Sequence, residues 1–424
     1  MINMDTILIA HDDSVGIVYC PERGSVKTTT PEHAKRLQSV YNDYNDKKLS
    51  EQECSEFEQY LENTFKNKEV LPYASFPNLL ELEVLERLEI MLANDCNLNC
   101  KYCYAGGGNY GKTPTRMNPE DVEKYLDALL IGKYRSVGIV MLFGGEPTIA
   151  PKTIQAICEY FNKNVLNGTF CSMPTFTMVS NGTLIDEKLV EIIKKYEIRV
   201  TISVDGPKDI NDLLRVDRNG NGTFSRIEHG IRLMQSAGCP PKMIEATYTS
   251  LHKQMGYDKK KLHAYLKDHF GVERILVANC TATPDNDVLA YNDDSEIEST
   301  KDSLEIRIGL ARKFFVDVSC SAGISSCALM PNGELYPCHF FVNDNAFRIA
   351  TFSKDEFDYD NYPNVLSHMS PSHKCNNARC AKCWAKTLCK ACPAGMILQP
   401  QDTSSCKLER SRLVNMLLQE AKRM

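Results

Sequence analysis

The sequence has no apolar run long enough for a signal peptide or a membrane-spanning helix. Near its start, only residues 7–10 are apolar before the polar His11, whereas a signal peptide needs roughly 7–15 apolar residues and a membrane span about 20. An excess of basic residues is also missing, since 49 Lys and Arg stand against 55 Asp and Glu. Such a balance offers no electrostatic attraction to nucleic acid or to an anionic membrane. We therefore expect a cytoplasmic protein that binds neither.

Cysteine, by contrast, is abundant, with 18 residues in the chain. Structural disulfides are rare in a reducing cytosol, which leaves metal binding or catalysis as the usual reason for so many thiols. Three cysteines lie between Cys96 and Cys103, and nine lie between Cys320 and Cys406. The six others are scattered, and we expect them to be small buried side chains. The two dense groups predict metal sites.

A chain of 424 residues is longer than one hydrophobic core normally supports, so we expect several domains. Within residues 84–290, short apolar runs alternate with amphipathic stretches, which is typical of strand-helix units repeated around a parallel sheet. The predicted strands are residues 88–93, 138–143, 175–180, 199–204, 244–249 and 274–278. The predicted helices are residues 119–130, 151–161, 187–195, 224–236 and 259–269. This pattern predicts an α/β fold, a partial (β/α)6 barrel, with its functional side chains just after the strands.

The segment before the barrel predicts a small α+β domain over residues 1–80. Strand-like runs occupy residues 6–10 and 15–19, and a first helix begins at about Glu32. A capping-box pattern at residues 50–53 predicts a second helix.

The segment after the barrel has weaker periodicity. Apart from one helix predicted near residues 303–314, residues 291–406 are dominated by Gly, Pro, Asn and Cys. Such a composition cannot build a large apolar core, so we expect metal clusters to hold this region together. A final helix is predicted within residues 407–424.

The first cysteine group directly follows the first predicted strand and has the pattern Cys96-x3-Cys100-x2-Cys103. A cubane four-iron four-sulfur cluster takes four ligands, so three thiolates leave one iron open to a further ligand. A structural zinc site normally uses four protein ligands, and no fourth Cys or His lies near in sequence. Zinc stays the alternative to an iron-sulfur cluster here.

This motif, with an aromatic residue before its last cysteine, resembles that of the radical S-adenosylmethionine (SAM) superfamily. Gly144-Gly145-Glu146-Pro147 after the second strand is similar to the motif with which that superfamily binds the methionine part of SAM. Glycine suits such a place because it lacks Cβ and lets backbone approach. The resemblance implies a four-iron four-sulfur cluster on the three cysteines and further SAM contacts from Tyr102, Ser180, Asn181, Ser203, Asp205 and Arg215. Alternatively, residues 181–182 form only a turn and Arg215 lies on a solvated helix face.

The second cysteine group follows Gly333-x4-Cys338 and resembles the SPASM extension of radical SAM enzymes that mature peptides. That extension houses two auxiliary four-iron four-sulfur clusters. The resemblance implies that one is held by Cys320, Cys338 and Cys392 and the other by Cys380, Cys383, Cys389 and Cys406. This chain departs from the pattern in having two rather than three residues between Cys389 and Cys392, which puts Cys392 in doubt. Cys327 or Cys375 could be the fourth ligand of the first cluster. Without a fourth ligand, an open iron of that cluster could bind a substrate thiolate. A structural extension with zinc ribbons is the alternative to both auxiliary clusters.

The resemblance also implies a reaction. An electron donor such as flavodoxin or ferredoxin would reduce the cluster, and SAM would be cleaved to methionine and a 5′-deoxyadenosyl radical that removes a substrate hydrogen atom. Sulfatase-maturing relatives carry an Asp that acts as general base directly after the cysteine that corresponds to Cys338, where this chain has His339. The chain thus resembles instead the enzymes that form thioether or carbon-carbon crosslinks in ribosomally made peptides. His339 could be a catalytic base, a partner of the cluster or a packed ring.

Residues 1–80 are similar to the winged-helix element with which such maturases bind a precursor's leader as an added strand. A generic α+β cap is the alternative. We expect a maturase that forms a thioether between a Cys thiol and a carbon of an acceptor residue in a precursor peptide. A maturase that forms a carbon-carbon crosslink or another oxidation, and a non-catalytic iron-sulfur electron carrier, are the alternatives.

Overall fold

The computed structural model describes residues 2–71, 73–74, 78–280, 289–290, 315–316, 318–401 and 403–423. The chain divides into two compact units. We call Pro77–Ile297 with Ser321–His368 the barrel unit, and Met1–Phe76 with Glu298–Cys320 and Met369–Met424 the terminal unit. The helix expected near residues 303–314 lies outside the described residues. The second cysteine group is divided, because Cys338 belongs to the barrel unit and the cysteines from 375 onward to the terminal unit.

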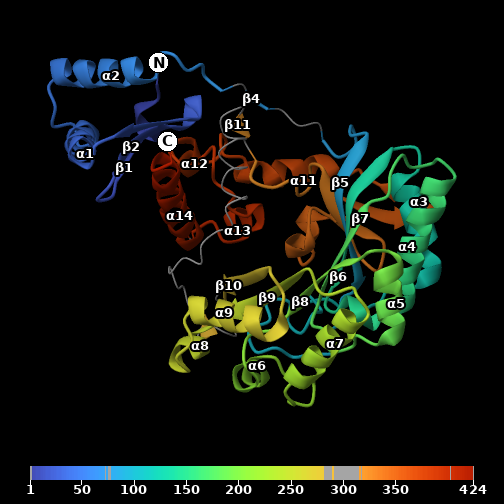
Figure 1. Cartoon of the computed structure of the whole chain (residues 1–424). Helices are drawn as coiled ribbons and strands as arrows, with labels where there is room; N and C mark the ends of the chain where they lie inside the picture. Colours follow the sequence, from blue (N-terminus) through green and yellow to red (C-terminus); the bar gives the residue numbers. More distant parts are fainter. Residues whose placement is uncertain are drawn as a thin grey trace. The chain divides into compact units, whose positions relative to one another are not determined.

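The barrel unit is built on one ten-stranded sheet in the order β10-β9-β8-β7-β6-β5-β12-β13-β14-β15. Its first six strands run parallel, each beside its neighbour in the chain (Figure 1). They are β5 (Val84–Ala93), β6 (Ser136–Gly144), β7 (Thr175–Ser180), β8 (Arg199–Ser203), β9 (Met243–Tyr248) and β10 (Ile275–Asn279). The prediction of a parallel sheet of six strands is confirmed, and β7 has the expected bounds.

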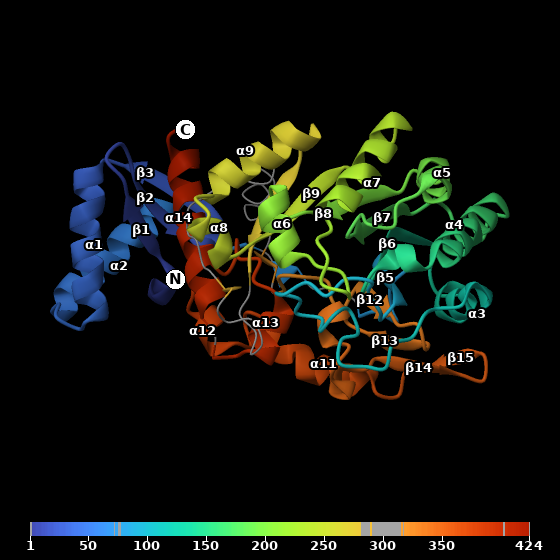
Figure 2. The same cartoon turned by 90° about the horizontal axis from the view of Figure 1, so that it is seen from below.

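Helices cover one face of these strands (Figure 2). They are α3 (Pro119–Leu130), α4 (Pro151–Leu166), α5 (Glu187–Lys195), α7 (Phe224–Ser236) and α9 (Lys259–Phe270), with the short α6 (Lys208–Leu214), α8 (Ser250–Gln254) and the 3-10 turn η3 (Pro147–Ile149) between elements. Along β9, Ile244 and Ala246 are fully buried toward the helices, whereas Met243 and Glu245 are half-buried on the opposite, inner face. This alternation follows from the strand's two-residue period.

The sheet continues beyond β5 with four short strands that the sequence did not predict. They are β12 (Ser326–Leu329), β13 (Glu334–Tyr336), β14 (Ala350–Ser353) and β15 (Glu356–Asp358). β12 pairs in parallel with β5, and the other three follow as antiparallel neighbours. Two 3-10 turns, η5 (His339–Phe341) and η6 (Asn345–Phe347), and α11 (Tyr362–Met369) complete the segment. The sequence analysis gave this region no strands and expected metal clusters to hold it together, whereas these four strands extend the barrel sheet from β5 and bring Cys338 beside that strand.

The terminal unit contains a three-stranded antiparallel sheet in the order β1-β2-β3. Its elements are β1 (Leu8–His11), β2 (Gly16–Cys20), β3 (Ser25–Thr29), α1 (Pro31–Asn45) and α2 (Glu51–Phe65), with the 3-10 turns η1 (Met4–Thr6) and η2 (Pro21–Arg23). The predicted capping box is present, since the Ser50 side chain accepts a hydrogen bond from the Glu53 N–H and the Glu53 side chain accepts one from the Ser50 N–H. The third strand, β3, was not predicted. A two-residue strand, β4 (Tyr73–Ala74), pairs in parallel with β11 (Phe315–Val316).

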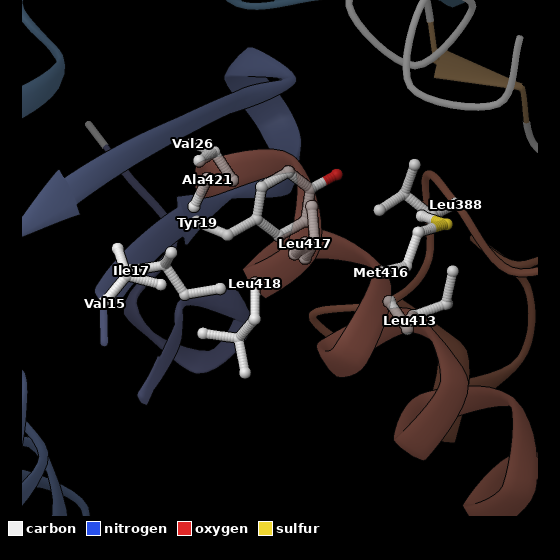
Figure 3. Packing of buried hydrophobic residues seen from close by; sticks show 11 residues of the cluster. Val15, Ile17, Tyr19, Val26, Leu388, Leu413, Met416, Leu417, Leu418 and Ala421 are labelled. Atoms are coloured by element: carbon white, nitrogen blue, oxygen red, sulfur yellow. The ribbon is translucent and has the colours of Figure 1, made fainter. Parts of the chain in front are cut away.

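The last helix, α14 (Ser404–Ala421), closes the second face of this sheet. Val18 and Cys20 of β2 pack toward α1 and α2. Ile17 and Tyr19, on the other face of the same strand, pack with Leu413 and neighbouring residues of α14 (Figure 3). The cysteine-rich segment between α12 (Ala378–Ala381) and α13 (Pro393–Leu398) contributes Ala385 and Leu388 to that second core. The three-stranded sheet therefore shares a core with α14.

No helix in the described part of the chain combines the length and the apolar character needed to cross a bilayer.

Candidate functional site

The loop that carries Cys96, Cys100 and Cys103 leaves the end of β5 and is anchored by Asp95. The Asp95 carboxylate forms ion pairs with Arg116, at 2.8 Å, and with Arg218. Burial would raise the pKa of Asp95, but the two guanidinium groups outweigh it and hold that pKa below its usual value. The Asp95 carbonyl oxygen also accepts a hydrogen bond from the Glu146 N–H at 2.9 Å. The start of the loop is thus fixed through both its side chain and its backbone.

Glycines allow the loop to lie directly against the end of β6. Gly144 has a φ of 136°, and a Cβ there would stand 2.3 Å from the Ala93 carbonyl oxygen. A Cβ on Gly145 would stand 2.3 Å from the Asp95 carbonyl oxygen. Close backbone approach at these glycines was predicted, although the approaching group seen here is the cysteine loop itself.

Glu146 lies behind this contact and is almost completely buried. Its carboxylate accepts hydrogen bonds from Ser180 Oγ at 2.8 Å, from the Asn181 N–H at 2.7 Å and from Thr148 Oγ1 at 2.6 Å. Burial raises the pKa of Glu146 in spite of these donors. Asn181 Nδ2 lies 3.8 Å from Cys96 Sγ. The structure therefore gathers Glu146, Ser180 and Asn181 beside the first cysteine.

Tyr102, Asp205 and Arg215 form a second buried group against the loop. The Tyr102 hydroxyl donates to Asp205 Oδ2 at 2.6 Å and accepts a hydrogen bond from Arg215. Arg215 Nη1 lies 3.8 Å from Asp205 Oδ1, and the Thr247 N–H donates to the same oxygen at 3.0 Å. Burial raises the pKa of the Tyr102 hydroxyl well above its usual value. The alternative that places Arg215 on a solvated helix face is wrong, because this side chain is only 9% exposed.

The three thiols suit an iron-sulfur cluster with one open iron. Burial raises the pKa of Cys96 to about 12 and that of Cys100 to about 11, and neighbouring thiols contribute to both increases. A bound metal reverses such a shift, because it binds the thiolate. The Leu98 N–H points at Cys96 Sγ at 3.4 Å, a contact that stabilises cluster sulfur. In the described ranges no three Cys, His, Asp or Glu side chains converge tightly enough for a single metal ion, whereas a cubane spreads its thiolates over separate irons.

Four of the later cysteines also gather, within the terminal unit. Burial raises the pKa of Cys380 to about 11, and the nearby thiols of Cys389, Cys383 and Cys406 add to the increase. These four are the set expected to hold one auxiliary cluster, and their chemistry fits such a group.

The cysteines expected at the other auxiliary cluster are divided between the two units. Cys338 is buried in the barrel unit, whereas Cys320 and Cys392 belong to the terminal unit. Of the two extra cysteines, Cys327 is fully buried on β12 and Cys375 is exposed. The complete burial of Cys327 favours a packed thiol at that position.

His339 is held by a residue that the sequence analysis missed, Glu89 of β5. The Glu89 carboxylate accepts from the His339 N–H at 3.1 Å and lies 3.0 Å from its Nδ1. Burial would raise the pKa of Glu89, but His339, with a contribution from Arg87, lowers it below its usual value. The imidazole packs against Phe143, with ring centroids 4.7 Å apart. A charged residue within the otherwise apolar run of residues 88–93 was the signal that could have revealed Glu89.

A cavity of about 450 Å³ borders the cysteine loop. Residues 95–97 line it, together with Arg116, Arg218, η3 and the start of α5. The first cysteine therefore faces an open space bounded by two guanidinium groups.

Comparison with known proteins agrees with this geometry. Residues 90–254 match the model of the Radical SAM superfamily. The chain contains a radical SAM domain. Members of that superfamily use SAM and a four-iron four-sulfur cluster, which are the cofactors expected from the sequence.

Individual relatives extend the comparison beyond this domain. An uncharacterized protein of Methanocaldococcus jannaschii is 33% identical over 156 residues, which are 37% of this chain and 51% of that protein, so the chain spans about half of this relative's length. A cysteine-type anaerobic sulfatase-maturating enzyme of Clostridium novyi is 22% identical over 70% of this chain and 85% of the enzyme. Crystal structures of Streptococcus suis SuiB, bound to S-adenosylmethionine and to the precursor peptide SuiA, align with 93% of this chain and 96% of SuiB, with a TM-score of 0.51 and 17% identity. These structures support the radical SAM fold.

Proposed function

We propose that this chain is a radical SAM peptide maturase that joins a cysteine sulfur of a precursor peptide to a carbon of an acceptor residue. The observation that carries the proposal is the trio of thiols after β5, packed by glycines against the end of β6 beside Glu146 and Asn181. When bound there, SAM and its cluster supply the hydrogen-abstracting radical. Relatives that mature sulfatases or bind a precursor peptide support a peptide as substrate.

The cysteine loop and the strand ends around it have separate tasks in this proposal. Cys96, Cys100 and Cys103 would hold the cluster, and Gly144 and Gly145 would admit the methionine end of SAM. Ser203, on the inner face at the end of β8, would bind the ribose of SAM.

The buried group behind the loop would have two tasks. Tyr102, Asp205 and Arg215 would keep the loop in place through the hydrogen bonds between them. No described residue accepts a hydrogen bond from the buried Arg215 Nε, so that atom is free to face the carboxylate of SAM.

His339 would handle the proton of the substrate thiol. Its Nδ1 is tied to Glu89, which fixes the ring and leaves Nε2 to accept a proton from the peptide. Thioether formation removes two hydrogens from the peptide, so a second electron acceptor is needed besides the radical. An auxiliary cluster on Cys380, Cys383, Cys389 and Cys406 would supply it.

The sheet of the terminal unit would bind the precursor's leader as an additional strand. β1 and β3 are its edges, because the strand order is β1-β2-β3. Strand addition satisfies the free backbone groups of an edge without requiring a preformed pocket.

The test is anaerobic incubation of reduced enzyme with SAM and a short Cys-containing peptide encoded next to its gene. We expect 5′-deoxyadenosine and a product two hydrogens lighter that has lost one alkylatable thiol. A product that is two hydrogens lighter but keeps its thiol would show that the enzyme forms a carbon-carbon crosslink and not a thioether. If no 5′-deoxyadenosine forms, the proposal of a radical SAM catalyst is wrong, and the non-catalytic electron carrier is the alternative that is left. The Cys96→Ala variant is the matched control and should form none.

A further inference from the structure

A fully buried histidine, His252, lies behind Asp205 and has no part in the chemistry proposed above. It belongs to the short α8 that follows β9. One face of its imidazole stacks on Tyr248, with ring centroids 5.1 Å apart and an angle of 27° between the ring planes. Its Nδ1 lies 3.0 Å from the backbone nitrogen of Thr249, and its Nε2 lies 2.6 Å from the carbonyl oxygen of Asp205. Both ring nitrogens therefore contact backbone groups.

These two backbone partners determine which ring nitrogen carries the hydrogen. The Thr249 N–H can only donate, so Nδ1 of His252 accepts and has no hydrogen of its own. The Asp205 carbonyl oxygen can only accept, so the hydrogen of the ring lies on Nε2. A doubly protonated ring would turn an N–H toward the Thr249 N–H. His252 is thus a neutral imidazole that donates a hydrogen bond to Asp205.

This hydrogen bond fixes the peptide bond between Asp205 and Gly206. Gly206 has a φ of 136°, and a residue without Cβ does little to hold a neighbouring peptide in one orientation. Asn211 Oδ1 accepts from the Asp205 N–H at 3.2 Å, and His252 binds the carbonyl oxygen of the same residue. The backbone of Asp205 is therefore held on both sides, which sets the direction in which its carboxylate leaves the chain.

The Asp205 carboxylate, itself fully buried, organises the polar group behind the cysteine loop. Its Oδ2 accepts from the Tyr102 hydroxyl at 2.6 Å, and its Oδ1 lies 3.8 Å from Arg215 Nη1. Hydrogen bonds weaken steeply when their distance or angle changes, so a small turn of Asp205 would disturb both contacts. His252 therefore acts on the loop through Asp205.

We propose that His252 is a positioning residue of the radical SAM site. As a neutral donor at Nε2, it keeps the Asp205 carboxylate directed at Tyr102 and Arg215 and so maintains the place where SAM binds. The inference deepens the proposed function and rests on it, because it takes Arg215 to face the carboxylate of SAM. A histidine that only filled space in the core would not need a donor at Nε2.

The test uses two amide variants that each replace one ring nitrogen. The amide of Gln reaches the position of Nε2, whereas that of Asn reaches only the position of Nδ1 and ends short of Asp205. The dissociation constant of SAM is measured by equilibrium dialysis of the cluster-loaded enzyme. We expect His252→Asn to weaken SAM binding roughly tenfold, as the loss of one buried hydrogen bond would, and His252→Gln to stay within about twofold of the unaltered enzyme. His229→Asn, at an exposed position on α7, is the control and should change nothing.

Two further measurements examine the route and the hydrogen. In an Asp205→Asn background, His252→Asn should have little additional effect on SAM affinity, because residues that act through one another are not additive. The nitrogen-15 NMR spectrum of histidine-labelled enzyme should show the hydrogen of His252 on Nε2 alone, with its signals assigned as those missing in His252→Gln. This spectrum tests the inference even if His252→Asn does not fold.

Four results would overturn the positioning role. They are unchanged SAM affinity in a folded His252→Asn variant, equal weakening in the Asn and Gln variants, an undiminished effect in the Asp205→Asn background, and a hydrogen on Nδ1. SAM binding and formation of 5′-deoxyadenosine by the unaltered enzyme are measured in parallel. A failure of the proposed function is therefore seen in the unaltered enzyme, whereas a failure of this inference is seen only in the variants or in the spectrum.

Discussion

Several single polar residues in this chain hold the cysteine loop in place. Tyr102 is the clearest case, since its hydroxyl lies between Asp205 and Arg215 and joins the loop to the end of β8. The position before the last cysteine therefore has a structural task in addition to any contact with SAM.

We predict that Tyr102→Phe loosens the loop while the fold is kept. Without the hydroxyl, Asp205 and Arg215 stay 3.8 Å apart and only their direct ion pair is left. Iron should leave the reconstituted variant severalfold faster when a chelator is added, as followed by absorbance. Tyr265→Phe is the control, because no described residue bonds that hydroxyl in the barrel unit. Equal rates of iron loss in both variants would contradict the assigned task.

Glu89 gives a second prediction at this scale. Glu89→Gln keeps the size of the side chain but removes the charge that His339 and Arg87 face. We expect a loss of about 2 kcal/mol in the free energy of unfolding, the usual value of a hydrogen bond to a charged group. Urea denaturation at neutral pH measures it, and Glu83→Gln, whose side chain is largely exposed, should change little. A stability equal to that of the unaltered chain would mean that the contacts of the Glu89 carboxylate with His339 and Arg87 do not stabilise the fold.

At the scale of elements, the short strands after β12 depend on ion pairs as well as on pairing. Glu334 of β13 lies 3.0 Å from Lys112 and 2.9 Å from Arg348. Burial would raise the pKa of Glu334, but these partners outweigh it and lower that pKa to about 2 from 4.5. A carboxylate with a lowered pKa stabilises the fold above the pH at which the unfolded chain titrates, and this contribution is lost as the pH falls through its folded pKa.

We therefore predict that Glu334→Gln costs about 1–2 kcal/mol of unfolding free energy at neutral pH. The difference from the unaltered chain should shrink as the pH falls from 4.5 toward 2, the two pKa values of Glu334. Denaturant titrations across this range provide the measurement. Glu356→Gln on the exposed side of β15 is the control. A difference that is constant with pH would show that Glu334 acts by packing alone.

The predictable elements were those with a strong local pattern. Of the six parallel strands, β5, β6 and β10 carry apolar runs of at least four residues, and β7, β8 and β9 alternate between buried and less buried residues. Helices such as α3 and α5 begin and end where the sequence places them. β13 and β15 have three residues each and no pattern of their own. They form because the edge at β5 offers backbone partners, which is a tertiary effect that sequence periodicity does not contain.

In the candidate site, too, the residues with a local sequence pattern were predicted and those that depend on distant contacts were not. The cysteines and glycines have fixed spacing and were found, whereas Glu89 was missed because its partner His339 is 250 residues away. Ser180 was expected to face SAM, yet its hydroxyl donates to Glu146, another predicted residue. Contacts between predicted residues depend on the fold and could not be derived from spacing.

At the scale of the whole molecule, the cysteine-rich segment between α12 and α13 is part of the core of the terminal unit. The loop between Cys383 and Cys389 places Ala385 and Leu388 against β2. Within that loop, the Thr387 hydroxyl lies 2.5 Å from the Tyr19 hydroxyl, and Lys386 forms an ion pair with Glu22 at 3.2 Å. The metal site and the sheet should therefore stabilise one another.

We predict that removing iron from this group loosens the sheet. In a Cys380→Ser variant, or after chelation, amide hydrogen exchange should become faster in β1–β3 and in α14, and should stay unchanged in β6–β8. Cys171→Ser, at an exposed and isolated position, is the control. Unchanged exchange in β1–β3 would mean that the cysteine loop folds without its metal.

The packing of α14 on β2 also sets an order of events during synthesis. Ile17 and Tyr19 emerge from the ribosome early, but the helix that covers them is made only when residues 404–421 are translated. Until then one face of the nascent sheet stays apolar and uncovered, which is the condition under which chaperones bind growing chains. Removing the last helix would leave a newly made protein that is prone to aggregate, even though every residue of the radical SAM domain had already been built.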